Sequence, residues 1–298
     1  MRIASNTVSD NILNQLQKLG TNQANLQTQI ATGLRISKPE DDPAAFGRAV
    51  NFQSEQRRIA QYTTNASTAL AVSQASYEGL KTLKGVSDRA GEIATLGAGV
   101  LGQDAANSYA TEVNQLIEQA LQTANNAYNG NYLYAGTAVG APPFTAARDA
   151  AGNVTSVTNG GDTGTAAIAL SENSTIVPGT SSDTNTGIGD FITRLIGLRD
   201  ALKSGNTAAV SATQTGLTNS EDLVISSMAY AGGIQTRIEA AQNQLAGRTT
   251  TLVGLISDNS STDITTSVVK LSQASTAYEA ALSSASKIMK LSLLDYLN

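Results

Sequence analysis

The sequence predicts a mainly α-helical chain, a long antiparallel helical hairpin or coiled-coil rod with a small β-rich insertion. Three observations support this fold class. Apolar residues near both ends repeat at alternating steps of three and four, which is the period of a helical seam. Two long central stretches keep a helical pattern with few breaks, and an internal stretch between them is rich in turn residues and short alternating runs.

The first helical seam lies near the N-terminus, and the opposite face carries Asn, Gln and Thr. This seam consists of Ile12, Leu16, Leu19, Gln23, Leu26, Ile30 and Gly33. A second seam near the C-terminus consists of Ile264, Val268, Leu271, Ser275, Tyr278, Leu282, Ala285 and Met289. Because both seams have the same period, we expect the two terminal helices to pack against each other. The chain then ends on "LSLLDYLN", in which Leu293 and Leu294 add further apolar surface.

A helix start follows the first seam, in "SKPEDDPAAFGRAV". Asp42 can accept hydrogen bonds from free backbone N–H groups, and Pro43 suits the first helical position, where a missing N–H costs nothing. Asp41 and Asp42 could instead form a carboxylate pair for acid–base chemistry or cation binding. Their place at the positive end of a helix dipole favours capping. We expect this helix to run to about Leu96, a length on the order of 75 Å.

The segment "GAGVLG" interrupts the helical pattern. Gly97, Gly99 and Gly102 match G-x-G-x-x-G, and Glu118 lies near the spacing of a ribose-binding acid. A dinucleotide site needs a strand before the glycines, whereas the preceding "SDRAGEIATL" has a helical pattern. We therefore interpret the segment as a flexible break between helices and keep nucleotide binding as a distant alternative. The next helix is expected from about Asp104 to near Gly130.

The stretch 137–187 differs in kind, with alternating runs at 154–157, 167–170 and 175–177 between turn residues. A helical pattern resumes at Ile188, "KSGN" interrupts it, and a second long helix is expected from Thr207 to Ile256. We therefore expect three parts, listed by residue range: a terminal coiled coil of 1–36 with 261–298, a long-helix core of 37–136 with 188–260, and a β-rich insertion of 137–187.

Composition excludes several functional classes. The 298 residues include no Cys, His or Trp, so thiolate sites, Ser-His-Asp triads and imidazole-ligated metal centres are excluded. We expect no cofactor and no metal. A net charge of -5, from 19 basic and 24 acidic residues without a long single-sign run, argues against nucleic-acid binding. The sequence has no apolar run long enough for membrane insertion, and "MRIASNTVSDNILNQL" lacks the features of a secretory signal.

Three blocks of the sequence resemble the flagellin superfamily of bacterial flagella. They are "LQTQIATGLRISKPEDDPAAFGRAV", "NGNYLYAGTAVGAPPF" and "ITTSVVKLSQASTAYEAALSSASKIMKLSLLDYLN". In the first block, the turn after the family's first helix is matched by Thr32, Gly33, Arg35 and Ile36. Asp41 and Asp42 match the acids before its long helix, which begins here at Pro43. The second block and the Leu-rich ending are similar to the branch of this superfamily found at the junction of hook and filament.

The resemblance implies a non-enzymatic subunit of a tubular assembly, with its terminal helices in the inner layer. It implies that contacts between copies are carried by Ile12, Leu16, Leu19, Leu26, Ile30, Val268, Leu271, Tyr278, Leu282, Met289, Leu293 and Leu294. The implied partners are copies of this chain, other hook-associated proteins, flagellin, and an export chaperone at the C-terminal segment. The resemblance also implies export through the flagellar type III channel without a cleaved signal, to an extracellular place in the flagellum.

Two alternatives to the junction role remain besides nucleotide binding. The chain could be a filament flagellin, since the first block is common to the superfamily. It could also act as an adhesin-like surface protein through the stretch 146–187, for which the sequence suggests no relative.

Overall fold

A computed structural model describes the backbone of residues 2–99 and 102–297, and the side chains of 10–99 and 102–287. The chain divides into two compact units, residues 1–58 with 248–298 and residues 59–247. The helices are α1 (Arg2–Thr32), α2 (Pro43–Gly97), α3 (Gln103–Ala124), α4 (Ser182–Lys203), α5 (Thr207–Ser260) and α6 (Ile264–Leu297). The strands are β1 (Ala127–Tyr128), β2 (Asn131–Tyr132), β3 (Phe144–Arg148), β4 (Val154–Asn159), β5 (Ile168–Ser171) and β6 (Ser174–Ile176). The predicted mainly α class with a small β-rich part is confirmed.

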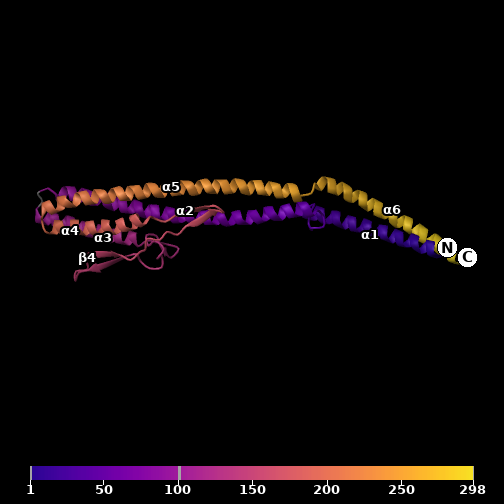
Figure 1. The fold of residues 1–298 in the computed structure, drawn as a ribbon, viewed down its shortest axis with the longest axis horizontal. Coiled ribbons are helices and arrows are strands. Elements are labelled where there is room, and N and C mark those ends of the chain that lie inside the picture. The colour runs from indigo at the N-terminus through magenta and orange to yellow at the C-terminus, as the bar shows by residue number, and fades with distance from the viewer. Residues whose placement is uncertain (1, 100–101, 298) are drawn as a thin grey trace. The chain divides into compact units, whose positions relative to one another are not determined.

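The first unit pairs the two terminal helices, and Figure 1 shows α1 and α6 running side by side. The start of α2 and the end of α5 lie in the same unit. There Arg248 forms a bidentate ion pair with Glu55, with nitrogen–oxygen distances of 2.8 and 3.0 Å. The pairs Arg248–Glu55 and Arg48–Asn259 join residues in reverse order along the chain, so α2 and α5 are antiparallel here.

The second unit has a core formed by α2, α3, α4 and α5. Its fully buried large side chains include Leu80, Leu83, Ile93, Ile117, Ile188, Phe191, Ile192, Leu195, Leu198 and Leu202. Arg89 on α2 holds Glu112 on α3 through two hydrogen bonds of 2.6 and 3.1 Å. Among the described residues, none of the helices combines the length and apolar character that a membrane span requires.

At "GAGVLG" the helix α2 ends, and its last residue, Gly97, packs against Leu202 on α4. The segment lies between α2 and α3, so a helix occupies the place where a dinucleotide fingerprint requires a strand. A Cβ added at Gly97 would lie 2.6 Å from Leu202 Cδ2, which explains why the chain has glycine there. Glu118, at the spacing of a ribose-binding acid, instead pairs with Arg148 on β3, with Nη2 to Oε2 at 2.8 Å. The geometry thus gives the nucleotide alternative no support.

The β-rich part consists, over the described residues, of three antiparallel strand pairs: β1 with β2, β3 with β4, and β5 with β6. It begins at Ala127, earlier than the predicted 137, because Asn129 and Gly130 form a two-residue turn with φ of 49° and 82°. It ends earlier too, because Ser181 caps α4 by accepting a hydrogen bond of 3.2 Å from Thr184 N. The third helix ends at Ala124, not near Gly130.

Polar anchors fix the strands on the helices. The Asn125 amide donates to Phe144 O at 2.8 Å and accepts from Phe144 N at 3.0 Å, so it stands in for a strand partner of β3. Arg199 on α4 is buried, and its guanidinium donates to Val154 O on β4 at 2.6 Å. The β5–β6 pair covers a second small core, whose buried members include Ala66, Ala69, Leu170, Ile176, Ile234 and Ile238.

Tyr134, which follows the β1–β2 pair, is fully buried against α2. Its hydroxyl donates a hydrogen bond of 2.9 Å to Ser76 O, and burial raises the pKa of the phenol well above its usual range. The ring fits because position 79 on α2 is glycine, where an added Cβ would overlap the Tyr134 hydroxyl. The resembling block "NYLYAGT" therefore carries an anchor between the β-rich part and α2.

We expect Gly79→Ala to lower the free energy of unfolding of the second unit by about 1 to 3 kcal/mol, because the new methyl group displaces the Tyr134 ring. The matched control is Gly85→Ala, on the same helix, where an added Cβ meets nothing within 4 Å. That control should raise stability by up to about 1 kcal/mol through helix propensity alone. Urea unfolding followed by circular dichroism compares the two variants, and an equal gain in both would contradict the anchor.

Candidate assembly surface

The two connections of the first unit, between α1 and α2 and between α5 and α6, are joined to each other. Gly33 ends α1 with φ of 70°, a conformation that favours glycine. Gly33 O accepts from Thr262 N at 2.9 Å, and Arg35 N donates to Ser260 O at 2.7 Å. Leu34 and Ser261 form the antiparallel bridge between these two hydrogen bonds. The joint therefore holds the ends of both terminal helices together.

Side chains reinforce this joint. The Arg35 guanidinium donates to Asn259 O at 3.1 Å and lies 3.7 Å from an Asp42 carboxylate oxygen. Arg48 on α2 donates to Asn259 Oδ1 at 2.9 Å, and the Ile36 side chain is buried. The structure thus brings Gly33, Arg35, Ile36 and Asp42 into one cluster, together with Asn259, which the sequence reasoning missed.

The adjacent acids Asp41 and Asp42 have separate roles. Asp42 Oδ1 accepts from Ala45 N at 3.0 Å, directly before Pro43 begins α2. Asp41 Oδ2 accepts from Ser37 N and Lys38 N, both at 2.9 Å, and so closes the turn before the helix instead of capping it. These backbone hydrogen bonds lower the pKa of both carboxyls below the usual value. No group of three metal-ligating side chains occurs among the described residues.

The start of α6 also has a cap that the sequence reasoning missed. The Asp263 carboxylate accepts from Thr266 Oγ1 at 2.7 Å and from Thr266 N at 3.2 Å, and these bonds lower the pKa of Asp263. An acid directly before an apolar-periodic run was the available signal.

The seam between α1 and α6 uses the predicted positions on α1. Leu26 is buried, and the half-buried positions include Ile12, Leu16, Leu19 and Ile30. On α6 the packed positions are Ser267, Leu271, Ala274, Tyr278, Ala281 and Ala285. Leu271, Tyr278 and Ala285 were predicted, and so was Ser275, which is half-buried. Ile264, Val268 and Leu282 were also predicted but do not lie in this seam, since they are 53%, 48% and 44% exposed. The small side chains at Ser267, Ala274 and Ala281 take their places.

Small residues predominate in the row of α6 that faces α1. A Cβ added at Gly20 on α1 would lie at an ordinary contact distance of 3.7 Å from Tyr278 Cε2, so the tyrosine ring lies beside Gly20 in the seam. The row that faces α1 has small side chains at Ala274, Ala281 and Ala285, whereas Val268 and Leu282 lie in an exposed row. The larger aliphatic side chains are consequently turned away from α1.

A band of exposed large apolar side chains remains on the terminal helices and their joint. We call it the outer stripe, and it consists of Leu13, Leu34, Ile264, Val268, Val269 and Leu282. Each of these side chains is at least 39% exposed. Few charges interrupt it, since the sequence from 264 to 287 contains only Lys270, Glu279 and Lys287. Met289, Leu293 and Leu294, also predicted as contact residues, lie outside the described side chains.

Comparison with known families matches the N-terminal half. Residues 3–139 match the family described as the bacterial flagellin N-terminal helical region. The predicted resemblance to the flagellin superfamily is therefore confirmed.

Two curated relatives carry the name flagellar hook-associated protein 3. The protein of Salmonella typhimurium is 27% identical over 148 residues, which cover 48% of this chain and 46% of the relative. The protein of Escherichia coli is 31% identical over 120 residues, which cover 39% and 37%. The chain therefore matches less than half the length of these relatives.

A solved structure from Vibrio parahaemolyticus, described as a flagellar hook-associated protein, has the same fold. It is 16% identical, aligns with a TM-score of 0.66, and covers 74% of this chain and 100% of its own. At this identity the likeness concerns the fold alone.

We expect Asp42→Ala to lower the thermal stability of the first unit at neutral pH, because Ala45 N loses its acceptor. Asp42→Asn is the matched control, since its amide oxygen can still cap and does not titrate. Because the folded pKa of Asp42 lies below the usual 3.8, the carboxylate stabilises the fold above that pH and loses its effect as pH falls further.

The difference in melting temperature between wild type and Asp42→Ala should therefore shrink below about pH 4. Circular dichroism melts from pH 7 to pH 2 measure it. A difference that stayed constant over this range would show that the Asp42 charge has no part in the cap.

Proposed function

We propose, from the flagellin N-terminal helical region in residues 3–139, that this chain is a structural subunit of the bacterial flagellum that joins the hook to the filament. The names of both curated relatives support the junction role over the filament role. The chain would act by packing its terminal helices against those of neighbouring copies, other hook-associated proteins and flagellin. No catalytic step enters this proposal.

The observation that carries the proposal is the outer stripe. The α1–α6 pair covers one row of each helix and leaves Val268, Val269 and Leu282 exposed on α6. Together with Leu13, Leu34 and Ile264, they are six large aliphatic side chains that the single chain leaves open to contact with a neighbour. A neighbouring helix of the same kind would cover the stripe and would meet Glu279, which lies on the same face three residues before Leu282. The predicted contact residues Val268 and Leu282 would thus serve contacts between subunits.

Hydrophobic burial is large enough to drive this assembly. At about 25 cal/mol per Å², a few hundred Å² of apolar surface covered by each neighbour gives several kcal/mol before ordering costs are subtracted. A subunit in a ring or tube touches several neighbours, so such contributions add. Leu16, Leu19, Leu26, Ile30, Leu271 and Tyr278 would then support assembly indirectly, by holding the α1–α6 pair that presents the stripe.

The proposal also includes a route to the cell exterior. Narrow export channels require an unfolded chain, and a pair of long, weakly charged helices with one seam between them is a suitable substrate because it unfolds at low cost. We propose export through the flagellar type III channel. Before export, a chaperone would bind the C-terminal segment. The exported subunit would be extracellular, within the flagellum.

We expect Val268→Asp to abolish incorporation into flagella while the first unit stays folded, because this side chain is half exposed in the single chain. Leu26→Asp, by contrast, should abolish incorporation and also unfold the first unit, since Leu26 is only 8% exposed in the α1–α6 seam. Circular dichroism reports the fold, and electron microscopy of cells complemented with each variant reports incorporation. Val268→Ile is the control and should assemble normally. Normal flagella in cells with Val268→Asp would contradict the role of the stripe.

The junction and filament roles differ in what the purified chain does at a growing end. A junction subunit should add to hook fragments in a limited number of layers and should not extend them further. A filament flagellin should elongate filament seeds indefinitely. Electron microscopy of the purified chain with hook fragments and with filament seeds separates the two. Growth of long filaments from this chain alone would contradict the junction role and support the filament role.

A further inference from the structure

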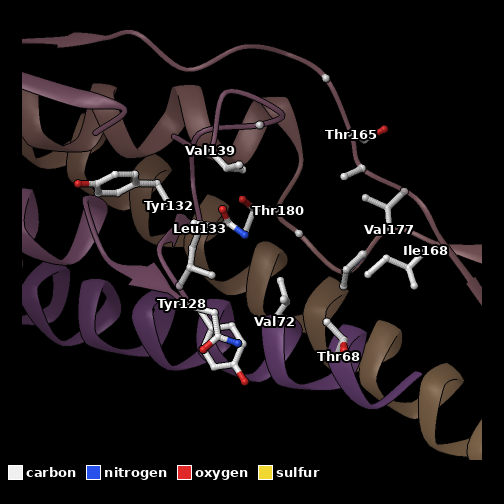
Figure 2. Close-up of a pocket in the computed structure, with 17 residues that line it drawn as sticks. Thr68, Val72, Tyr128, Tyr132, Leu133, Val139, Thr165, Ile168, Val177 and Thr180 are labelled. Atoms are coloured by element: carbon white, nitrogen blue, oxygen red, sulfur yellow. The ribbon is translucent and has the colours of Figure 1, made fainter. Parts of the chain in front are cut away.

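A cavity of about 300 Å³ lies in the second unit, between α2 and the β-rich part. Thr68 and Val72 on α2 form one side, Tyr128 and Tyr132 of the β1–β2 pair form another, and segments 164–168 and 177–180 close the third. Figure 2 shows Val72, Leu133, Ile168 and Val177 around this space. The volume lies at the lower end of the range for small-molecule sites.

The cavity is apolar and uncharged. Its aliphatic side chains, Val72, Leu133, Val139, Ile168 and Val177, are all only half-buried, whereas Leu170 and Ile176 close by on β5 and β6 are buried. The five half-buried side chains all expose apolar surface toward the cavity. None of the 17 described residues that line the cavity is Asp, Glu, Lys or Arg. A charged ligand would therefore lose its hydration without gaining a partner, so the site selects a neutral one.

Thr180 gives the cavity a directional polar group. Its hydroxyl donates to Asn185 Oδ1, so toward the cavity the same oxygen can only accept a hydrogen bond. A ligand that satisfies Thr180 must consequently be a donor. The aromatic ring of Tyr128 favours an aromatic ligand, which can stack on this ring or meet its edge, whereas the Tyr132 ring points away from the space in Figure 2.

We propose that this cavity binds a small neutral aromatic molecule with one hydrogen-bond donor, of the phenol class. The ring lies among the aliphatic side chains, and its hydroxyl donates to Thr180 Oγ1. This site is independent of the assembly role, because no residue of the outer stripe lines it.

The test uses the full chain and three probes of matched size: p-cresol, 4-methylanisole and 4-hydroxybenzoate. Labelled methyl groups of Val72, Leu133, Val139, Ile168 and Val177 report binding by NMR. We expect p-cresol to shift these methyl signals with a Kd of about 1 mM, as suits a ligand of this size. The ether, which cannot donate, and the benzoate, which is charged, should bind at least about tenfold more weakly.

Variants link the binding to the cavity. Val72→Phe fills the space and should remove p-cresol binding, whereas Ile225→Phe, at an exposed position on α5 outside the cavity, should not. Thr180→Val should reduce the preference for p-cresol over the ether, and Thr180→Ser should keep it. Equal binding of all three probes, or binding that survives Val72→Phe, would overturn the proposal.

The phenol group could also belong to a tyrosine of another protein. N-acetyltyrosinamide carries the same ring on a peptide backbone. Tighter binding of this probe than of p-cresol would overturn the assignment to a free small molecule in favour of a protein partner. Weaker binding, from backbone atoms that do not fit the cavity, would support it.

Discussion

Two helices packed side by side can bury only one row of side chains each, and the terminal helices of this chain depend on that limit. The row of α6 that faces α1 contains the small side chains Ala274, Ala281 and Ala285 around Tyr278. The larger Val268 and Leu282 are left outside. Stability within the chain and the proposed association between chains therefore use different sides of the same helix. Under the proposed function, this separation would let a subunit keep its α1–α6 pair before a neighbour covers the outer stripe.

The joint at Gly33 and Ser260 makes this arrangement specific. A weakly charged pair of helices with a heptad seam could slide by one heptad with little change in buried area. The hydrogen bonds of Gly33 with Thr262 and of Arg35 with Ser260 fix the register at one end. Asp42 and Asp263 then cap the helices that leave the joint. The residues that resemble the flagellin signature thus set the position of the seam, although they contribute little buried apolar surface themselves.

Sequence periodicity predicted the helices well and their contact faces only in part. Pro43 and Thr207 begin α2 and α5 as expected, because a proline start and a clear break are local signals. The choice between Val268 and Ser267 as contact residues is not local, since the two rows share Leu271 and Tyr278. Hydrophobicity alone selects the valine, whereas in the structure Ser267 is buried and Val268 is 48% exposed. The Asn129-Gly130 hairpin was predictable from its sequence, but a short strand pair is easily missed beside long helices.

The cavity beside α2 could not be predicted from local sequence patterns. Its walls come from residues 68–72, 128–139 and 164–180, which meet only because Tyr134 fits against Gly79 and because Asn65 holds Ala169 O. Each wall taken alone is an ordinary Thr-, Val- or Gly-containing stretch. The donor role of Thr180 toward Asn185 depends on the start of α4, a further element. The proposed ligand site thus lies in the part of the chain with the least regular sequence, whereas the proposed assembly surface lies where the sequence is most periodic.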